Sequence, residues 1–377
     1  MTQFLSKSKT FLISFAILCL CGVNAYGNWH NFRGNRNLTG VSSGSISDNP
    51  ELIWTYNTGG DSCSSAVIAG NTVFVGSDNG KVFALNLKKG SQRWEFNGQG
   101  TFLSGPLYFN KKIYVTSSRG ILYCLDSATG KLIFRFKTDV KIAGSPNSFM
   151  INTKNYIVFG CYDNKIYCLE ADTGKSVWQY QTKHYINGTP SYYNKKIIFG
   201  GCDSFLRILS AESGKLLFKI KSDSYIAGSA ALYKGKGYFG NFGSSVTCFN
   251  ADSGKTIWKY TNKNEDAPFL ASPAVTQNKI IIGSRDYHLY CFAADKGRLL
   301  WKTATNGEID GSPVIAGKKI VFTSGDGRIY IADLKTGKIK WEYEIGGVLT
   351  VTPAVSHNII IVGSDDGSVY AFGKREK

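Results

Sequence analysis

The stretch Glu170-Ala171-Asp172-Thr173-Gly174-Lys175-Ser176-Val177-Trp178 decides the fold, because close copies of it recur along the chain. Each copy joins a Gly-containing turn to a short segment that carries an aromatic residue. Successive aromatic residues lie 40 to 44 residues apart, which is the spacing of a repeat architecture. There are eight of them: Trp54, Trp94, Phe134, Trp178, Phe218, Trp258, Trp301 and Trp341.

The order of features within each unit is constant. The aromatic strand is followed by a small-residue segment such as 144–146 and an apolar strand such as 359–362. A polar turn such as 78–80 and a last strand such as 123–126 complete the unit. Four short strands with Gly, Asn and Asp turns make one propeller blade. The sequence therefore predicts an all-β fold, an eight-bladed β-propeller of four-stranded antiparallel blades.

The two ends of the repeat region predict how the ring closes. The first aromatic strand, 52–56, has no preceding blade, and the last unit, 350–373, lacks an aromatic strand of its own. Joining the two completes the last blade and leaves no unpaired end. We therefore expect one propeller domain over 51–377. A ring of seven blades is the competing count, if the first strand lies outside the ring.

The N-terminus has the pattern of a signal peptide. Lys7 and Lys9 precede an apolar run over 10–22, and small residues end at Ala25. This pattern predicts a signal peptide at 1–25, an extension at 26–50, and export to the periplasm or the extracellular space. The alternative is a lipoprotein anchored through Cys19 or Cys21, although leucine precedes both where a lipobox has a small residue.

Four of the cysteines that follow the signal peptide are predicted to be buried thiols. An odd number of seven remains, and four of them share one repeat position that small or apolar residues fill in other units. Equivalent positions in neighbouring blades lie beyond bridging distance. The four are Cys124, Cys168, Cys248 and Cys291, and the equivalents are Ala84, Ile331 and Ala371.

The chain carries a formal net charge of +17, and the predicted topology divides its charges between two faces. Lysines gather in turns on one face: Lys111, Lys112, Lys131, Lys175, Lys195, Lys196, Lys215, Lys234, Lys236, Lys255, Lys318, Lys319 and Lys338. The other face holds candidate binding residues in rim loops: Phe102, Tyr185, Tyr225, Phe269, Phe205, Tyr287, Asp139, Asp223, Asp266 and Asp310.

Each face has an ordinary and a functional interpretation. Lysines in turns serve solubility, or they dock the protein on an anionic membrane surface or polymer. The aromatic and acidic face lines an ordinary funnel, or it binds a protein partner, because loops on a rigid scaffold carry recognition and aromatics anchor interfaces. Export argues against nucleic acid as a ligand.

The sequence contains no convincing motif of a catalytic or metal site. Residues 235–240 satisfy G-x-G-x-x-G but lead into a strand, where no helix N-terminus receives a phosphate. The histidines, His30, His184, His288 and His357, fall in different units without the spacing of metal ligands. We therefore predict no metal site and no catalytic residue.

The repeated turn resembles the tryptophan-docking motif of the PQQ-like (pyrroloquinoline quinone) β-propeller family. The resemblance covers 51 to the C-terminus, and the lead over 29–36 resembles a W-x-x-F-R-G segment of exported members. In that family the aromatic residue packs between adjacent blades, so the resemblance implies that the eight anchors are structural.

The same resemblance implies two functional branches. Quinoprotein dehydrogenases bind PQQ beside a Ca²⁺ cage, and some carry adjacent cysteines or a C-x-x-C-H haem site, but neither cysteine pattern occurs here. We therefore expect the other branch, a non-catalytic BamB-like scaffold of outer-membrane protein assembly type. It would be a monomeric propeller without a cofactor that binds envelope or secreted proteins through its rim loops. The alternatives are a PQQ- and calcium-dependent oxidoreductase, and a secreted propeller that binds a carbohydrate or another polymer.

Overall fold

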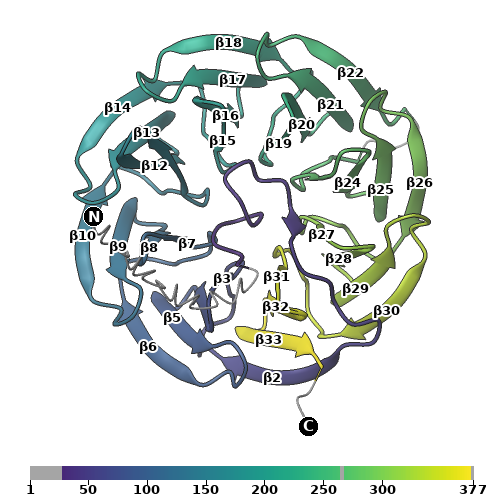
Figure 1. Cartoon of the computed structure of the whole chain (residues 1–377), viewed down its shortest axis with the longest axis horizontal. Helices are drawn as coiled ribbons and strands as arrows, with labels where there is room; N and C mark the ends of the chain where they lie inside the picture. Colours follow the sequence, from purple (N-terminus) through teal and green to yellow (C-terminus); the bar gives the residue numbers. More distant parts are fainter. Residues whose placement is uncertain (1–27, 264–266, 375–377) are drawn as a thin grey trace, which may run out of the picture.

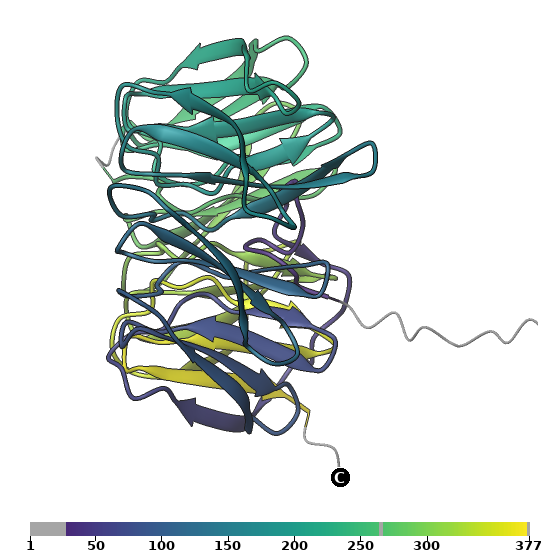
Figure 2. The same ribbon diagram turned by 90° about the vertical axis from the view of Figure 1, so that its left-hand side faces the viewer.

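The structure, a computed structural model, describes residues 28–263 and 267–374. The signal peptide expected at 1–25 lies outside the described residues. Within them all regular structure is β-strand, and no helix exists that could cross a membrane. Eight sheets form a ring around a central axis (Figure 1), and the ring is a flat disc when viewed edge-on (Figure 2). The predicted eight-bladed propeller of antiparallel blades is confirmed.

The first four blades each contain four consecutive strands, which run outward from the axis in chain order. Blade 1 contains β3 (Val67–Ala69), β4 (Thr72–Gly76), β5 (Lys81–Asn86) and β6 (Gln92–Asn97). Blade 2 contains β7 (Leu107–Phe109), β8 (Lys112–Thr116), β9 (Ile121–Asp126) and β10 (Leu132–Lys137). Blade 3 contains β11 (Asn147–Ile151), β12 (Lys154–Gly160), β13 (Lys165–Glu170) and β14 (Ser176–Gln181). Blade 4 contains β15 (Ser191–Tyr193), β16 (Lys196–Gly200), β17 (Phe205–Ser210) and β18 (Leu216–Lys221).

The last four blades follow the same plan, with additions at the two ends of the chain. Blade 5 contains β19 (Ala231–Tyr233), β20 (Lys236–Gly240), β21 (Ser245–Asn250) and β22 (Thr256–Thr261). Blade 6 contains β23 (Ala274–Val275), β24 (Lys279–Gly283), β25 (His288–Ala293) and β26 (Leu299–Ala304). Blade 7 contains β27 (Val314–Ala316), β28 (Lys319–Thr323), β29 (Arg328–Asp333) and β30 (Ile339–Glu344), and β1 (Val41–Ser42) pairs in parallel with β27. Blade 8 contains β31 (Ala354–Ser356), β32 (Ile359–Gly363), β33 (Ser368–Gly373) and, outermost, β2 (Glu51–Asn57).

The core lies between neighbouring blades. In β16 three consecutive residues, Ile197, Ile198 and Phe199, are buried, because both faces of a blade pack against its neighbours. The outermost strands instead alternate between half-buried and exposed positions, as in β14. The ring closes as expected, because β2 pairs antiparallel with β33, with Trp54 opposite Ala371.

Each aromatic anchor except the last rests on a turn glycine of the next blade. A β-bulge precedes every anchor and redirects the strand there. Gly214 has φ +69°, and a Cβ there would lie 2.7 Å from the ring of Trp178. The Trp178 indole N–H donates to the Ala211 carbonyl at 3.0 Å. Trp341 faces blade 8, where the two ends of the chain close the ring, and it packs edge-on against Phe372 at 5.6 Å.

The N-terminal extension crosses the centre of the ring (Figure 1). Residues 29–42, which we call the strap, hydrogen-bond to the innermost strand of every blade, or to the side chain of its first residue. The bonds are Ile68 N–H to Trp29 O, Tyr108 N–H to His30 O, Asn147 Nδ2 to Arg36 O, Tyr192 N–H to Arg36 O, Leu232 N–H to Asn37 O, Val275 N–H to Thr39 O, Ile315 N–H to Gly40 O and Ser42 Oγ to Val355 O. Seven of these contacts supply backbone acceptors, and Ser42 supplies a donor, to groups of the innermost strands that face the axis.

A buried cation fixes the middle of the strap. The guanidinium of Arg33 donates to the carbonyls of Pro313 at 2.6 Å and Pro273 at 2.9 Å, which belong to blades 7 and 6. Burial lowers the pKa of Arg33 to about 9. A carbonyl pair, and not a carboxylate, therefore holds the strap against two blades.

The described cysteines are all free thiols, which confirms the expectation from the repeat position. Cys124, Cys168, Cys248 and Cys291 each pair across the sheet with the anchor of their own blade and are fully buried. Burial raises the pKa of Cys124 to about 12.

Candidate protein-binding face

The two faces of the ring carry different connections. Because the strands of a blade alternate in direction, the first-to-second and third-to-fourth hairpins lie on one face. The strap closes the channel there, with Asn37 and Thr39 beside Lys234 and Gln277 of the inner hairpins, so we call it the strap face. The second-to-third turns and the linkers between blades lie on the opposite face. We call that the funnel face, because the axial cavity opens there with Phe32 of the strap among its lining residues.

Each linker between blades repeats three positions. In the linker after blade 3, Tyr185 is exposed at the rim, Ile186 is buried, and Asn187 lines the funnel. The amide N–H at the buried position donates to a turn of the preceding blade, as from Ile226 to Gly201 O at 3.3 Å. The residues at the buried position are Cys63, Phe102, Ile142, Ile186, Ile226, Phe269, Ile309 and Leu349, all at most 3 % exposed.

The prediction that Phe102 and Phe269 are rim contacts is wrong. Both occupy the buried linker position, where an apolar side chain holds the linker against the blade. Phe102 packs edge-on against Tyr123 at 5.7 Å, and Phe269 packs edge-on against Tyr290 at 5.2 Å. Both side chains are therefore part of the core.

Three of the predicted aromatic residues lie exposed on the funnel face: Tyr185, Tyr225 and Tyr287 are 46 %, 53 % and 48 % exposed. Tyr185 stacks on Tyr162 of the preceding blade's turn at 4.7 Å, and Tyr225 lies edge-on to Phe242 of the following blade's turn at 6.1 Å. The stacking restricts these rings before any partner arrives, so the rim presents a pre-arranged arc of aromatic surface over blades 3 to 6.

Phe205 lies apart from this arc. It begins β17, and the amine of Lys219 lies 3.6 Å from the centre of its ring. The cation covers the ring on the side of blade 4.

The predicted acidic residues differ in their partners. Asp139 is exposed and forms no ion pair within the described residues, whereas Asp223 pairs with Lys259. Asp310 accepts from Arg285 at 2.7 Å and is only 18 % exposed. Asp266 lies outside the described residues.

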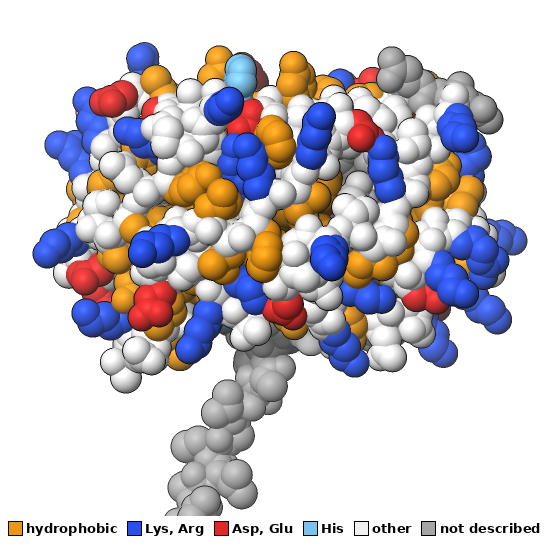
Figure 3. Space-filling model, turned by 90° about the horizontal axis from the view of Figure 1, so that it is seen from above, with side chains coloured by type: hydrophobic (Ala, Val, Ile, Leu, Met, Phe, Trp, Pro, Cys, Tyr) orange, Lys and Arg blue, Asp and Glu red, His pale blue; other side chains and the backbone are white. Residues whose placement is uncertain are grey.

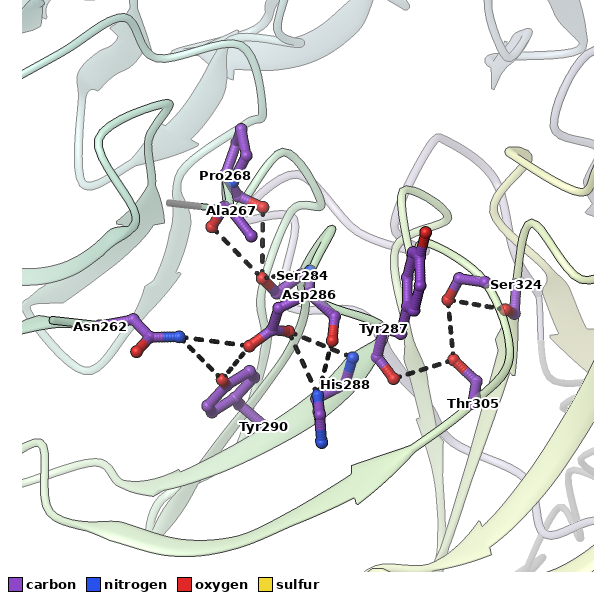
Figure 4. Close-up of polar contacts among 11 residues, drawn as sticks. Asn262, Ala267, Pro268, Ser284, Asp286, Tyr287, His288, Tyr290, Thr305 and Ser324 are labelled. Atoms are coloured by element: carbon purple, nitrogen blue, oxygen red, sulfur yellow. Dashed lines mark hydrogen bonds and ion pairs between the residues drawn. The ribbon is translucent and has the colours of Figure 1, made fainter. Parts of the chain in front are cut away.

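A second set of carboxylates on this face holds turns in place. Asp286 accepts from Tyr290 Oη and from Asn262 Nδ2, as Figure 4 shows, and from the N–H of His288 at 3.2 Å. The ring of Tyr287 points away from this cluster (Figure 4). Blades 3, 7 and 8 repeat the Asp–Tyr pair four residues apart: Asp163–Tyr167, Asp326–Tyr330 and Asp366–Tyr370. These acids stabilise turns, which leaves the linker acids as the candidates for recognition.

The funnel is a small polar cavity of about 260 Å³. Hydroxyl groups of successive blades form a ring of hydrogen bonds around it. The N–H of Thr189 donates to Ser229 Oγ at 2.8 Å, and the pattern continues through Ser272 and Ser312 to Thr352 and Ser65. Backbone and hydroxyl groups, with Asp310 as the one carboxylate, make up most of the polar lining.

These residues do not fit a quinone held by calcium. A Ca²⁺ site takes six to eight oxygen ligands with several carboxylates. Asp310 is the single acidic side chain that lines the cavity, and Arg285 already neutralises it. Within the described residues no cluster of three His, Cys, Asp or Glu side chains could hold a metal. The cavity is also smaller than typical cofactor pockets.

Sequence reasoning missed several features of this face. Tyr162, Phe242 and Val348 are exposed or stacked beside the predicted rim residues. A small residue, usually Ser or Thr and followed by Pro in six of the eight units, recurs once per blade and gave a signal for the hydroxyl ring. The strap gave no periodic signal, since it occurs once.

The matches to protein families agree with this architecture. Residues 122–377 match the family described as the β-propeller of the beta-alanine-activating enzyme, and residues 45–116 match the family described as outer membrane protein assembly factor BamB. Fold and matches together define an eight-bladed propeller of the PQQ-like class. The match over 122–377 covers more than half of the chain, so the chain belongs to that β-propeller family, and its PQQ-like repeats are similar to those of BamB over 45–116.

Individual relatives are distant. BamB of Moranella endobia is 34 % identical over 73 residues, which are 19 % of this chain and 19 % of that protein. The chain spans about a fifth of the length of the curated relatives that it matches. Among solved structures, BamB from Moraxella catarrhalis has a TM-score of 0.71 at 18 % identity and covers 86 % of this chain and 100 % of that one. A europium-containing methanol dehydrogenase has a TM-score of 0.76 at 15 % identity, covering 92 % and 98 %. The structural likenesses show the fold alone.

Proposed function

We propose that this chain is a non-catalytic, exported scaffold that binds protein partners of the cell envelope through the rim of its funnel face. The function is of the type named in its BamB relatives, outer-membrane protein assembly. The observation that carries the proposal is the exposed arc of Tyr185 and Tyr225 on linkers and Tyr287 on a blade turn, all on one face. Clustered aromatic residues anchor protein interfaces, whereas single exposed apolar residues are common everywhere.

The charges beside the arc favour a partner segment with basic and apolar residues. Asp139 lies in the linker before Tyr162, and Glu308 and Asp310 lie beside Tyr287 in a rim cavity of about 290 Å³. Arg285 neutralises part of this charge. Rim charges steer association and determine which partners are rejected more than they determine affinity.

We further propose that the propeller works without a resident cofactor. The poor fit of the funnel to quinone and calcium supports this, and a PQQ-dependent oxidoreductase or a polymer-binding propeller remains as the alternative. No lining residue favours a second function over the first.

A comparison of variants tests the proposal. The double variant Tyr185→Ser/Tyr225→Ser should capture at least tenfold less of its partner proteins from envelope extract than the wild type. Arg93→Ser, at an exposed site on the outer strand of blade 1 and away from the funnel face, should capture as much as the wild type. Equal capture by all three proteins would contradict the proposal.

The enzymatic alternative has its own readout. Purified protein with added PQQ and Ca²⁺ should show no saturable quinone absorbance and no dye reduction. A saturable signal that Asp310→Asn removes would establish the oxidoreductase instead.

A further inference from the structure

The exposed apolar residues of the strap face lack the aromatic side chains that accompany aliphatic ones on the funnel face. They are aliphatic side chains and one methionine, with no aromatic ring among the large exposed side chains of the described residues there. All of them lie in blades 2 to 6: Leu132, Ile133, Met150, Val177, Leu216, Leu217, Ile257 and Leu299. We call these residues the aliphatic belt.

All belt residues except Met150, which lies on the inner strand β11, are at the start of an outer strand. Leu216 and Leu217 begin β18 directly after the turn lysine Lys215, and Ile257 follows Lys255 in β22. Figure 3 shows the outer wall of the ring on the side of β18 and β22, where hydrophobic side chains lie among Lys and Arg side chains. At the same outward position blades 1 and 7 carry Arg93 and Lys340 instead. The belt is therefore confined to one sector of the ring.

Lysines without ion-pair partners accompany the belt. Lys131, Lys175, Lys215 and Lys255 form no salt bridge within the part of the chain that the structure describes, whereas Lys196 of an inner hairpin pairs with Asp252. The unpaired charges remain available to a ligand.

Backbone conformation gives an independent observation in the same sector. Lys111, Lys195 and Lys234 lie at the tips of inner hairpins with φ of +59°, +58° and +46°. This conformation is unfavourable for a residue with a Cβ, and glycine is the usual occupant. The equivalent hairpins of blades 1 and 7 use Gly70 and Gly317. Blades 2, 4 and 5 thus hold a tip lysine in a strained conformation, whereas the tip lysine of blade 7, Lys318, lies beside Gly317 without a positive φ.

From these observations we propose that the strap-face sector of blades 2 to 6 binds an anionic lipid surface. Aliphatic side chains can enter the boundary between headgroups and acyl chains, while lysine amines contact lipid phosphates. A protein partner fits less well, because protein interfaces are depleted in lysine and enriched in aromatic residues. The proposal is independent of the funnel-face function, since the two surfaces share no residue.

The test uses co-sedimentation of the full chain with vesicles. Vesicles of phosphatidylcholine with roughly 30–40 % anionic phosphatidylglycerol should bind far more protein than vesicles of phosphatidylcholine alone. The reason is that each lysine near an anionic surface adds to the binding free energy. Binding should fall at 0.5 M salt, a concentration chosen because the screening length drops to roughly half its physiological value. Phosphatidylcholine vesicles also serve as the control for vesicle binding through the apolar run at 10–22, which does not depend on lipid charge.

Two matched charge reversals locate the surface. Lys195→Glu/Lys215→Glu changes the inner hairpin and outer turn of blade 4, and Lys318→Glu/Lys338→Glu changes the equivalent positions of blade 7. The blade 4 variant should bind anionic vesicles at least about 30-fold more weakly, and the blade 7 variant at most about threefold. Leu217→Ser/Ile257→Ser should weaken binding while leaving the salt dependence unchanged.

The variant Lys195→Gly separates binding from folding. It removes a charge and relieves the backbone strain, so vesicle binding should fall while the thermal midpoint stays the same or rises. Equal losses in the blade 4 and blade 7 variants, or no preference for anionic vesicles, would overturn the proposal. So would equally tight binding to soluble polyglutamate, because the ligand would then be a polymer and not a lipid surface.

Discussion

At the scale of single residues, the glycine beneath each anchor is the most constrained position of the repeat. Gly214 combines a positive φ with direct contact to the Trp178 ring, whereas Gly70 has φ +55° and nothing within 4 Å of an added Cβ. The two glycines therefore separate the cost of conformation from the cost of packing.

Gly214→Ala should destabilise the propeller by about 2–5 kcal/mol, the sum of a left-handed conformation and an overpacked contact. Gly70→Ala should cost about 1–2 kcal/mol, from conformation alone. Chemical denaturation of both variants measures the difference. Equal losses would show that the ring contact contributes nothing.

The cysteines give a second prediction at this scale. Burial raises the pKa of Cys63 and Cys161 to about 11, so both thiols are inaccessible and protonated near neutral pH. Cys202 is the one described cysteine that is not fully buried. In the folded protein a thiol reagent should therefore modify Cys202 first, and the other described cysteines only after denaturation. Mapping of labelled peptides by mass spectrometry checks the order, and rapid labelling of Cys63 would contradict it.

At the scale of elements, the strap is the segment whose stability should depend on pH. The His30 ring lies 4.9 Å from Tyr108, and burial lowers the pKa of His30 below its ordinary 6.5. The unfolded chain therefore binds the proton more readily just below pH 6.5. The free energy of unfolding falls as pH falls through that window, and the contribution of His30 to stability is fully present above it.

His30→Gln should remove this part of the pH dependence. The measurement is hydrogen exchange of the Ile68 and Tyr108 amides, which bond to the strap, between pH 5 and 7. Burial also lowers the pKa of His357, so His357→Gln serves as the control for a second group with the same sign. The same pH dependence in wild type and His30→Gln would contradict the assignment.

The repeat elements could be predicted from the sequence because their signal recurs eight times. A glycine turn precedes every aromatic strand after the first, and β2 has no preceding blade; together these features predict both the blade and the closure. The strap occurs once and bonds mainly through backbone groups, so its residues carry no pattern. Linker residues such as Phe102 and Tyr185 look alike in sequence, and only the register of the linker decides which one is buried.

At the scale of the whole molecule, the propeller presents two chemically distinct surfaces. Aromatic side chains and linker carboxylates surround the open funnel, while aliphatic side chains and unpaired lysines lie on the face that the strap closes. A flat disc can therefore meet two different partners at once without a change in conformation.

The central claim is that the funnel rim contacts a protein partner, and site-specific photo-crosslinking tests it most directly. A photoreactive amino acid would replace Tyr225 on the rim in one variant and Lys338 on the strap face of blade 7 in another. In intact cells the Tyr225 position should form a discrete crosslinked band to another protein, and the Lys338 position should not. A propeller that crosslinks to no protein from Tyr225, or equally from both positions, would contradict the account.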